Sequence, residues 1–216
     1  GLGGVVDGQE VIGVIPLRHV DGRPWWSEAI GRQLCERLRA LLNERPLSGH
    51  NLAFDTLVLL RFGLLTKRDK RGIDTMIAHH DTDASEMPHD LGHVESEFFE
   101  APRHKDDADA KFVEGIVSDY TLHLYCAKDV LAELRLVKPL LDRVVACGQQ
   151  WAFETDTKLA PVARDMGELG LCVDENVRAR LLTVLKKECA EHAGNVQQIV
   201  GIPNFNPNSF PQVGRF

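Results

Sequence analysis

No stretch of the sequence is long and apolar enough to span a membrane, and no signal-peptide pattern is present. Cysteine is scarce as well: the chain has five cysteines among its 216 residues, and no two of them form a Cys-x-x-Cys pair. An odd number of scattered cysteines argues against a disulfide framework and against a cysteine zinc site. These absences favour a reducing, cytoplasmic setting and no membrane partner.

Positive charge is in the minority. The 25 Lys and Arg residues face 32 Asp and Glu residues, which gives a formal net charge of -7 at pH 7. This balance argues against broad electrostatic binding of duplex nucleic acid, which requires clustered positive charge. The densest basic cluster is formed by Lys67, Arg68, Lys70 and Arg71. We interpret it as a solvated loop, so any nucleic-acid contact is expected to be local or to use a metal ion.

The apolar content, 44% of the residues, is sufficient to bury a core. Two short runs at residues 2–6 and 11–15, joined by an Asp-Gly turn, predict an antiparallel hairpin, and residues 47–49 predict a buried strand. Helices are predicted from Ser27 to about Asn43, through Asn51 and Asp55, from Thr75 with Asp74 as its cap, from Pro88 toward Phe99, and from Ser118 or Asp119 to Gly148. The alternation of helices and strands after a hairpin predicts an α/β fold, a mixed sheet with helices on its faces.

The character of the sequence changes near residue 150. Beyond Trp151 the pattern predicts helices only, with breaks at residues 167–170 and 201–207. We therefore expect two domains, residues 1–150 and residues 151–216.

Both ends of the chain are informative. The first residue is Gly1 rather than methionine, and a strand is predicted to follow within a few residues. A helix start of the Ser-x-x-Gln type at Ser209 has little room before Phe216. We expect the chain to be an interior piece of a longer protein.

Asp129 is a carboxylate at a position where a helix facing a core requires an apolar side chain. Its helical stripe, at spacings i, i+3, i+4 and i+7, consists of Leu122, Tyr125, Cys126 and Asp129. A buried carboxylate is costly unless it pairs with a cation or holds a metal ion. Asp129 is therefore a candidate site residue.

Asp55 repeats this pattern in a second predicted helix. Its stripe consists of Leu52, Asp55, Leu59 and Phe62, and Asn51 stands one turn before the acid. Each acid, taken alone, could pair with a nearby cation such as Arg61 or Lys128, or lie at a solvated margin. Two such acids with matching polar companions favour a shared site.

Three motifs carry a family resemblance. They are Ser48-Gly49-His50-Asn51 followed by Phe54-Asp55, then Ile73-Asp74-Thr75-Met76, and finally Tyr125-Cys126-Ala127-Lys128-Asp129. Their order, and the 74 positions between the two acids (129 minus 55), resemble the second and third exonuclease motifs of the DEDD superfamily, tyrosine subclass. Residues 159–174 and 206–213 are similar to the link into the thumb, and to the thumb end, of a family A DNA polymerase of bacterial or bacteriophage polymerase I type.

The resemblance implies a fold and an activity. Residues 1–150 are expected to form a ribonuclease H-like exonuclease domain, and residues 151–216 a helical linker and the beginning of a polymerase thumb. The implied function is proofreading: hydrolysis of the 3′-terminal nucleotide of DNA in the cytoplasm of a bacterial cell or a phage-infected host. The implied partners are the single-stranded 3′ end of DNA, a deoxynucleoside monophosphate product and the polymerase domain of the same chain.

The resemblance also implies site residues and a cofactor. Two Mg²⁺ ions, for which Mn²⁺ can substitute, would stabilise the attacking and leaving oxygens of the phosphodiester. Asp55 would hold one ion and Asp129 the other or its water, while Tyr125 would orient the attacking water. Asn51 would support the terminal nucleotide or Asp55.

Two further residues are placed by the same resemblance. His104 and Lys105 lie near the position where relatives hold an aromatic and a basic residue against the terminal base and phosphate. They are therefore candidate substrate-binding residues. An ordinary exposed loop, predicted at residues 101–110, is the competing interpretation.

One part of the family pattern has no match. The first motif, an Asp-x-Glu on the opening strand, would supply two more acids, and Asp7 and Glu10 have the wrong spacing and lie on the predicted hairpin turn. The chain alone is therefore expected to be inactive or nearly so. The alternative is a catalytically degenerate domain that serves as a structural or DNA-positioning scaffold for the polymerase.

Histidines form a separate cluster in the sequence. His89 and His93 are one helical turn apart and could bind zinc, with His79, His80 and Asp81 nearby. Because no complete four-ligand pattern is present, we interpret this segment as a surface loop and a helix start.

Overall fold

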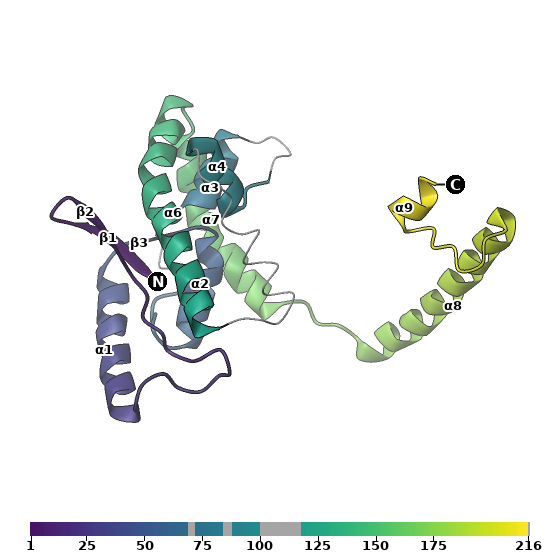
Figure 1. Ribbon diagram of the computed structural model, residues 1–216, viewed down its shortest axis with the longest axis horizontal. Coiled ribbons are helices and arrows are strands. Elements are labelled where there is room, and N and C mark those ends of the chain that lie inside the picture. Colours follow the sequence, from purple (N-terminus) through teal and green to yellow (C-terminus); the bar gives the residue numbers. More distant parts are fainter. Residues whose placement is uncertain (69–71, 84–87, 100–117, 216) are drawn as a thin grey trace. The chain divides into compact units, whose positions relative to one another are not determined.

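The computed structural model describes residues 1–68, 72–83, 88–99 and 118–215 (Figure 1). Helices predominate, and the chain divides into two compact units, Gly1–Glu168 and Leu169–Phe216. The division follows Glu168, whereas the sequence places a change of domain near residue 150. The assignment of residues 1–150 and 151–216 to an exonuclease domain and a thumb stays a prediction.

The predicted hairpin is confirmed. Strands β1 (Leu2–Val6) and β2 (Gln9–Gly13) pair antiparallel, with Leu2 opposite Gly13 and Val6 opposite Gln9. Asp7 and Gly8 have φ angles of 50° and 77°, the left-handed conformation that a tight two-residue hairpin turn requires. The second strand therefore begins and ends about two residues earlier than the β-branched run suggests.

The single mixed sheet that the sequence predicts is not found among the described strands. Strands β3 (Leu47–Gly49) and β4 (Gly72–Asp74) form a separate parallel pair, so the structure contains two small sheets there. Helix α6 (Asp119–Ala146) contacts β1, β2 and β3, and it is this helix, not a shared strand, that joins the two pairs. The coarse α/β class holds, with mostly helices, and the ribonuclease H-like fold stays a prediction.

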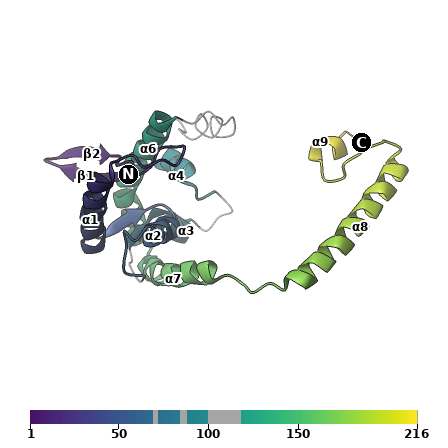
Figure 2. The same ribbon diagram turned by 90° about the horizontal axis from the view of Figure 1, so that it is seen from below.

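The predicted helices of the first unit are confirmed. They are α1 (Glu28–Glu44), α2 (Leu52–Arg61), α3 (Thr75–Thr82), α4 (Leu91–Phe98), α6 and α7 (Gln150–Leu169). Helix α4 begins three residues after Pro88, because the side chain of Asp90 caps it by accepting a hydrogen bond from the backbone N–H of His93 at 3.2 Å. Helix α7 runs beside α2 and α3 in Figure 2.

The core fixes the carboxyl-terminal half of α6. Buried side chains of α6 pack with those of α3 and α4: Ala78, Leu91, Val94, Ala132, Leu136, Leu140 and Val144. A second cluster lies around α1 and the end of α2: Leu38, Leu42, Leu64 and Leu65. The amino-terminal half of α6, which carries the third predicted motif, begins at Asp119, whose side chain accepts a hydrogen bond from the backbone N–H of Val20 at 2.8 Å and lies 2.7 Å from Nδ1 of His19. Both ends of α6 are therefore held.

The second unit contains α8 (Glu175–Val200) and α9 (Phe210–Val213). Asp174 caps α8 by accepting hydrogen bonds from the backbone N–H groups of Asn176 and Val177 at 2.9 and 3.0 Å. None of the residues of α8 is buried. Among the described residues, none of the helices combines the length and the apolarity that crossing a membrane requires.

Candidate functional site

Asp74 ties the second predicted motif to the start of α3. Its side chain is only 4% exposed. It accepts hydrogen bonds from four backbone N–H groups, those of Asn51 (3.1 Å), Leu52 (2.8 Å), Met76 (3.0 Å) and Ile77 (3.4 Å). The first N–H groups of a helix have no partner within the helix, and here one carboxylate serves the starts of both α2 and α3. The two helix starts are therefore fixed to each other.

Asn51 stands at the cap position of α2 in the left-handed conformation, with φ 59° and ψ 49°. Asparagine is one of the few residue types besides glycine that adopt this conformation readily. Its side chain makes no capping hydrogen bond to α2, and the residue is exposed. The backbone of Asn51 thus has a structural role, and the predicted role of its amide toward a nucleotide stays a prediction.

Asp55 lies in the first turn of α2, and the expectation of a buried stripe through it is wrong. Asp55 is exposed, and Phe62 lies beyond the helix and is 56% exposed. Leu52 and Thr56 are the buried residues of α2 instead. The reason is that α2 turns its i and i+4 pair Leu52 and Thr56 inward, where Arg164 of α7 donates a hydrogen bond to the Thr56 hydroxyl at 3.3 Å.

Tyr125 and Asp129 lie in the amino-terminal half of α6, as predicted. Both are half-buried, and so are Leu122 and Cys126 on the same stripe. The stripe therefore lies at the margin of the packed unit rather than in its centre. A half-buried carboxylate at such a margin remains accessible to a cation from solvent.

The acids of the second and third motifs come together. Asp55 keeps an exposed surface, yet partial burial of its carboxylate raises its pKa; a backbone hydrogen bond lowers the pKa, and the negative charges of Asp74 and Asp129 raise it further. The effect of Asp129 on Asp55 requires proximity, although the two residues are 74 positions apart (129 minus 55). The site is thus an acidic cluster at the junction of α2, α3 and α6.

Gly1 approaches α6 closely beside this cluster. Gly1 lies against α6, where a Cβ on it would be 2.5 Å from Cγ2 of Val130 and 3.1 Å from Sγ of Cys126. Only glycine allows this close approach without displacement of its neighbours.

Glu133 belongs to the same cluster, and reasoning from the sequence missed it. It lies one helical turn after Asp129 and is only 8% exposed. The Thr75 hydroxyl donates a hydrogen bond to Oε2 of Glu133 at 2.5 Å, while Oε1 is buried without a partner in the described part of the chain. Burial raises the pKa of Glu133 to about 7; the Thr75 hydrogen bond lowers it, and the charges of Asp74 and Asp55 raise it.

His50 and Thr75 extend this cluster by a chain of hydrogen bonds. Nε2 of His50 is 2.7 Å from the backbone carbonyl of His89, so this nitrogen must donate. Nδ1 of His50 is 3.1 Å from the Thr75 hydroxyl. The Thr75 hydroxyl has one hydrogen, so it can donate to Glu133 or to Nδ1 of His50 but not to both. A protonated Glu133 can donate to the Thr75 hydroxyl, which leaves that hydroxyl free to donate to His50.

The raised pKa of Glu133 predicts a loss of stability as the pH rises. The pKa of Glu133 is 4.5 in the unfolded chain and about 7 in the folded chain. Its protonated form therefore contributes stability that is fully present below pH 4.5 and is lost as the pH rises through about 7. The loss is about 3 kcal/mol. In Glu133→Gln the amide can still accept from Thr75 but cannot ionise, so this variant should lack the loss and be more stable than the unchanged chain at pH 8.

Urea unfolding followed by tryptophan fluorescence at pH 5 and pH 8 measures this effect. All three tryptophans, Trp25, Trp26 and Trp151, lie in the first unit. The matched control is Glu36→Gln, at an exposed position of α1, which should keep the pH dependence of the unchanged chain. An equal loss in Glu133→Gln and in the unchanged chain would contradict the prediction.

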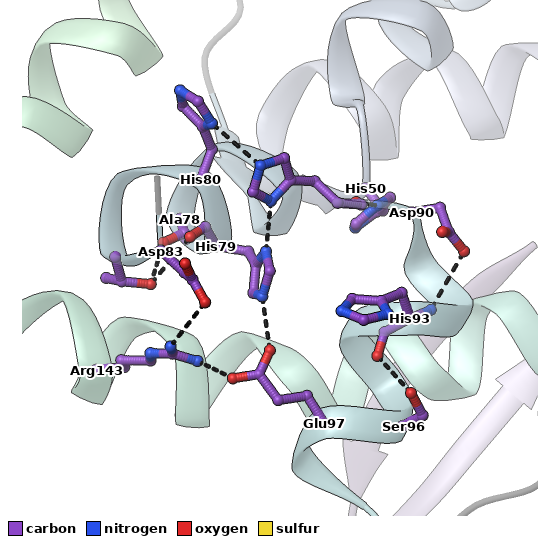
Figure 3. A network of polar contacts seen from close by, with 12 residues as sticks. His50, Ala78, His79, His80, Asp83, Asp90, His93, Ser96, Glu97 and Arg143 are labelled. Atoms are coloured by element: carbon purple, nitrogen blue, oxygen red, sulfur yellow. Dashed lines mark hydrogen bonds and ion pairs between the residues drawn. The ribbon is translucent and has the colours of Figure 1, made fainter. Parts of the chain in front are cut away.

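A second polar cluster lies between α3, α4 and α6 (Figure 3). Its residues His79, Asp83 and Glu97 place one possible ligand atom each within 4.8 Å of one another, a group that could hold a metal ion. His89 precedes α4, in keeping with the predicted helix start, and its Nδ1 lies 2.7 Å from Nδ1 of His79. His79 lies in α3 and is fully buried.

Two predicted substrate-binding residues are not tested. His104 and Lys105 lie outside the described residues, as do Lys70 and Arg71 of the basic cluster. In the described part of that cluster, the guanidinium of Arg68 is 3.3 Å from Asp165 and 2.8 Å from Glu168 of α7. Arg68 is thus engaged in ion pairs within the first unit.

Comparisons with known proteins give one relation. The sequence is 33% identical over 107 residues to DNA polymerase I of Aquifex aeolicus (strain VF5). The matched region covers 50% of this chain and 18% of that protein. The matched part therefore spans less than a fifth of the relative. No protein-family model matches the sequence, and no solved structure matches it. The similarity supports a DNA polymerase-related region, and the exonuclease subclass stays a prediction.

Proposed function

We propose that this chain is part of a DNA polymerase-related protein and carries residues of a 3′-5′ exonuclease site. The observation that supports this most is the proximity of Asp55 and Asp129, which come from separate motifs and lie close enough for the charge of Asp129 to raise the pKa of Asp55. The similarity to a DNA polymerase I supports it independently. The substrate is the single-stranded 3′ end of DNA, the product is a deoxynucleoside monophosphate, and the setting is the cytoplasm of a bacterial cell or a phage-infected host.

The acidic cluster fits divalent cations. Asp55 and Asp129 offer carboxylate oxygens, which Mg²⁺ and Mn²⁺ prefer. A cation between them would offset both the partial burial and the nearby negative charges that raise the pKa of Asp55. Two bound ions would stabilise the attacking and leaving oxygens of the phosphodiester. Asp55 would hold one ion and Asp129 the other or its water. Asn51, whose backbone N–H donates a hydrogen bond to Asp74, would support the terminal nucleotide or Asp55.

Tyr125 has a separate role in this proposal. It precedes Asp129 by one turn of α6, so both side chains emerge from the same side of that helix. Its hydroxyl can donate and accept, as required of a group that orients an attacking water toward a phosphorus atom. Holding the water in line is the contribution proposed for Tyr125.

The site is proposed to be incomplete within residues 1–216. The resemblance implies four acids, of which Asp55 and Asp129 match, and an Asp-x-Glu strand has no counterpart in this sequence. The test compares residues 1–216 with the longest reading-frame product that contains them, using single-stranded DNA labelled at its 5′ end and added Mg²⁺. The longer product should shorten the DNA from its 3′ end one nucleotide at a time, and residues 1–216 should do so slowly or not at all.

The outcomes of this comparison are distinct. Rapid release of mononucleotides by residues 1–216 would contradict the proposed incompleteness while supporting the nuclease. No Mg²⁺-dependent release by either polypeptide would contradict the nuclease. A DNA oligonucleotide whose 3′ end is chemically blocked is the control, because an exonuclease requires a free 3′ end.

A DNA-positioning scaffold is the second candidate. It is favoured by the lack of an Asp-x-Glu counterpart in this sequence, since residues 1–216 then supply only two of the four acids that the resemblance implies. A scaffold should bind a DNA end without hydrolysing it at any Mg²⁺ concentration. Binding of the same labelled DNA, measured by fluorescence anisotropy in the longer product, therefore separates the two candidates.

A further inference from the structure

His79 is a fully buried imidazole with a polar partner at each nitrogen. It lies in α3 and is 0% exposed. Its Nδ1 is 2.7 Å from Nδ1 of His89, and its Nε2 is 2.8 Å from Oε2 of Glu97 (Figure 3). A histidine held in this way has a fixed ring orientation, as metal-binding histidines do.

The elements around His79 bring two carboxylates to it. Asp83 follows His79 by four residues at the end of α3, so the two lie one above the other on the same side of the helix. Glu97 comes from the last turn of α4. One ligand atom from each of these three residues lies within 4.8 Å of the others, which a single ion can span.

The donor set selects the class of metal. One imidazole nitrogen and two carboxylate oxygens suit Zn²⁺ and the neighbouring first-row divalent ions, whereas Mg²⁺ and Ca²⁺ prefer oxygen ligands only. Three protein ligands leave a fourth position for water. This donor set differs from the all-carboxylate cluster of Asp55 and Asp129.

His89 supplies the outer support of such a site. If Nε2 of His79 binds a metal, Nδ1 carries the hydrogen and donates it to Nδ1 of His89. His89 is then the tautomer with hydrogen on Nε2, which lies 3.3 Å from Nδ1 of His80. The backbone carbonyl of His89 is itself fixed by His50 at 2.7 Å. A hydrogen-bonded partner of this kind orients a metal-binding imidazole and increases its basicity.

Arg143 of α6 is the competitor for the two carboxylates. Its guanidinium donates a hydrogen bond to Glu97 and lies 3.8 Å from Oδ2 of Asp83. The positive charge of Arg143 thus neutralises the acids when no metal is bound. Its guanidinium carbon also lies 5.6 Å from the centre of the Phe98 ring, an alternative contact that it can keep when a metal takes the carboxylates.

We propose that His79, Asp83 and Glu97 form a binding site for Zn²⁺ or a similar divalent ion, in which the metal displaces the guanidinium of Arg143. The site ties the end of α3 to α4 and shares no ligand residue with the proposed nuclease site. Because metal binds the folded state only, Zn²⁺ stabilises the first unit against unfolding.

The test measures Zn²⁺ binding to residues 1–216, freed of metal by a chelator, through competition with a chromophoric zinc indicator. One Zn²⁺ per chain should bind, and excess Mg²⁺ should not displace it. Asp83→Asn and Glu97→Gln should each weaken Zn²⁺ binding at least 10-fold, because each loses a charged ligand while keeping its shape. Glu95→Gln, on the same helix as Glu97, is the matched control and should bind as the unchanged chain does.

Arg143→Met gives the sharper result. If Arg143 competes with the metal, its removal should strengthen Zn²⁺ binding, whereas if it only supports the two carboxylates, its removal should weaken Zn²⁺ binding. This variant should bind Zn²⁺ about 10-fold more tightly, since the competing cation is gone. Without metal it should unfold at a lower temperature than the unchanged chain, and Zn²⁺ should restore the difference, as measured by tryptophan fluorescence. Visible absorption of bound Co²⁺ should appear in the unchanged chain and be lost in Glu97→Gln.

Two outcomes would overturn the proposal. Zn²⁺ binding that persists unchanged in both Asp83→Asn and Glu97→Gln would mean that exposed histidines such as His80 hold the ion. Weaker binding in Arg143→Met would mean that the guanidinium supports the carboxylates rather than competing for them. Neither outcome depends on whether the chain hydrolyses DNA.

Discussion

Replacing Asp74 with alanine is expected to lower the free energy of unfolding of the first unit by about 3–5 kcal/mol. The buried carboxylate accepts hydrogen bonds from four backbone N–H groups at the starts of α2 and α3. Each N–H group left without a partner in a buried place costs roughly 1–3 kcal/mol, and part of this cost is recovered where water can enter. The alanine variant also releases the two helix starts from each other.

Urea unfolding followed by tryptophan fluorescence measures this loss, because the fluorescence reports on the first unit alone. Ser118→Ala is the matched control. The exposed Ser118 hydroxyl caps α6 by accepting a hydrogen bond from the backbone N–H of Thr121 at 3.1 Å, and it also lies 2.9 Å from the Thr121 hydroxyl. Because water can replace the contact between the two hydroxyls, the loss of this cap should cost about 1 kcal/mol. If Asp74→Ala lowers the free energy of unfolding no more than Ser118→Ala does, the hydrogen bonds that join Asp74 to the starts of α2 and α3 do not stabilise the unit as described.

Replacing Asp55 or Asp129 with asparagine is expected to reduce Mg²⁺-dependent hydrolysis at a DNA 3′ end about 10³-fold. An amide keeps the shape of the side chain but removes the charge that would hold a divalent cation, which corresponds to roughly 4 kcal/mol of barrier. Tyr125→Phe should reduce hydrolysis less, about 10²-fold, because it leaves the ions in place and loses only the orientation of the water.

These activities are measured as kcat/KM on single-stranded DNA with the longest reading-frame product that contains residues 1–216. The matched control is Asp21→Asn, an exposed acid of the same unit whose side chain is 2.7 Å from Arg23. The control should retain full activity. Full activity in Asp129→Asn would contradict the proposed role of the α6 stripe, whereas a loss in Asp21→Asn would point to a general effect of charge.

Local structure could be predicted from the sequence because its causes are local. The Asp-Gly turn, the cap at Asp74 and the cap at Ser118 each fix the conformation of residues within three or four positions. The arrangement of the strands could not be predicted in this way. Pairing depends on which strands meet in space, and α6, not a shared strand, connects the hairpin to β3.

In the candidate site, too, the features with local causes could be predicted and those that depend on distant contacts could not. The helical spacing correctly puts Tyr125 and Asp129 on one side of α6, but the apolar neighbours of Asp55 suggest a buried position that the structure does not give it. The orientation of α2 is set by Thr56 and Arg164, which are 108 positions apart, and no local pattern contains that contact. The sequence does contain a signal for Glu133, because this residue follows Asp129 at the next i+4 position of the same stripe.

The position of Gly1 has a practical consequence for anyone who prepares this protein. A Cβ at this position would lie 2.5 Å from Cγ2 of Val130 and 3.1 Å from Sγ of Cys126, two α6 residues close to Asp129 in the sequence. Any side chain there would displace these neighbours and, with them, the part of α6 that carries Tyr125 and Asp129. Position 1 should therefore remain glycine in every variant whose cation binding or activity is compared.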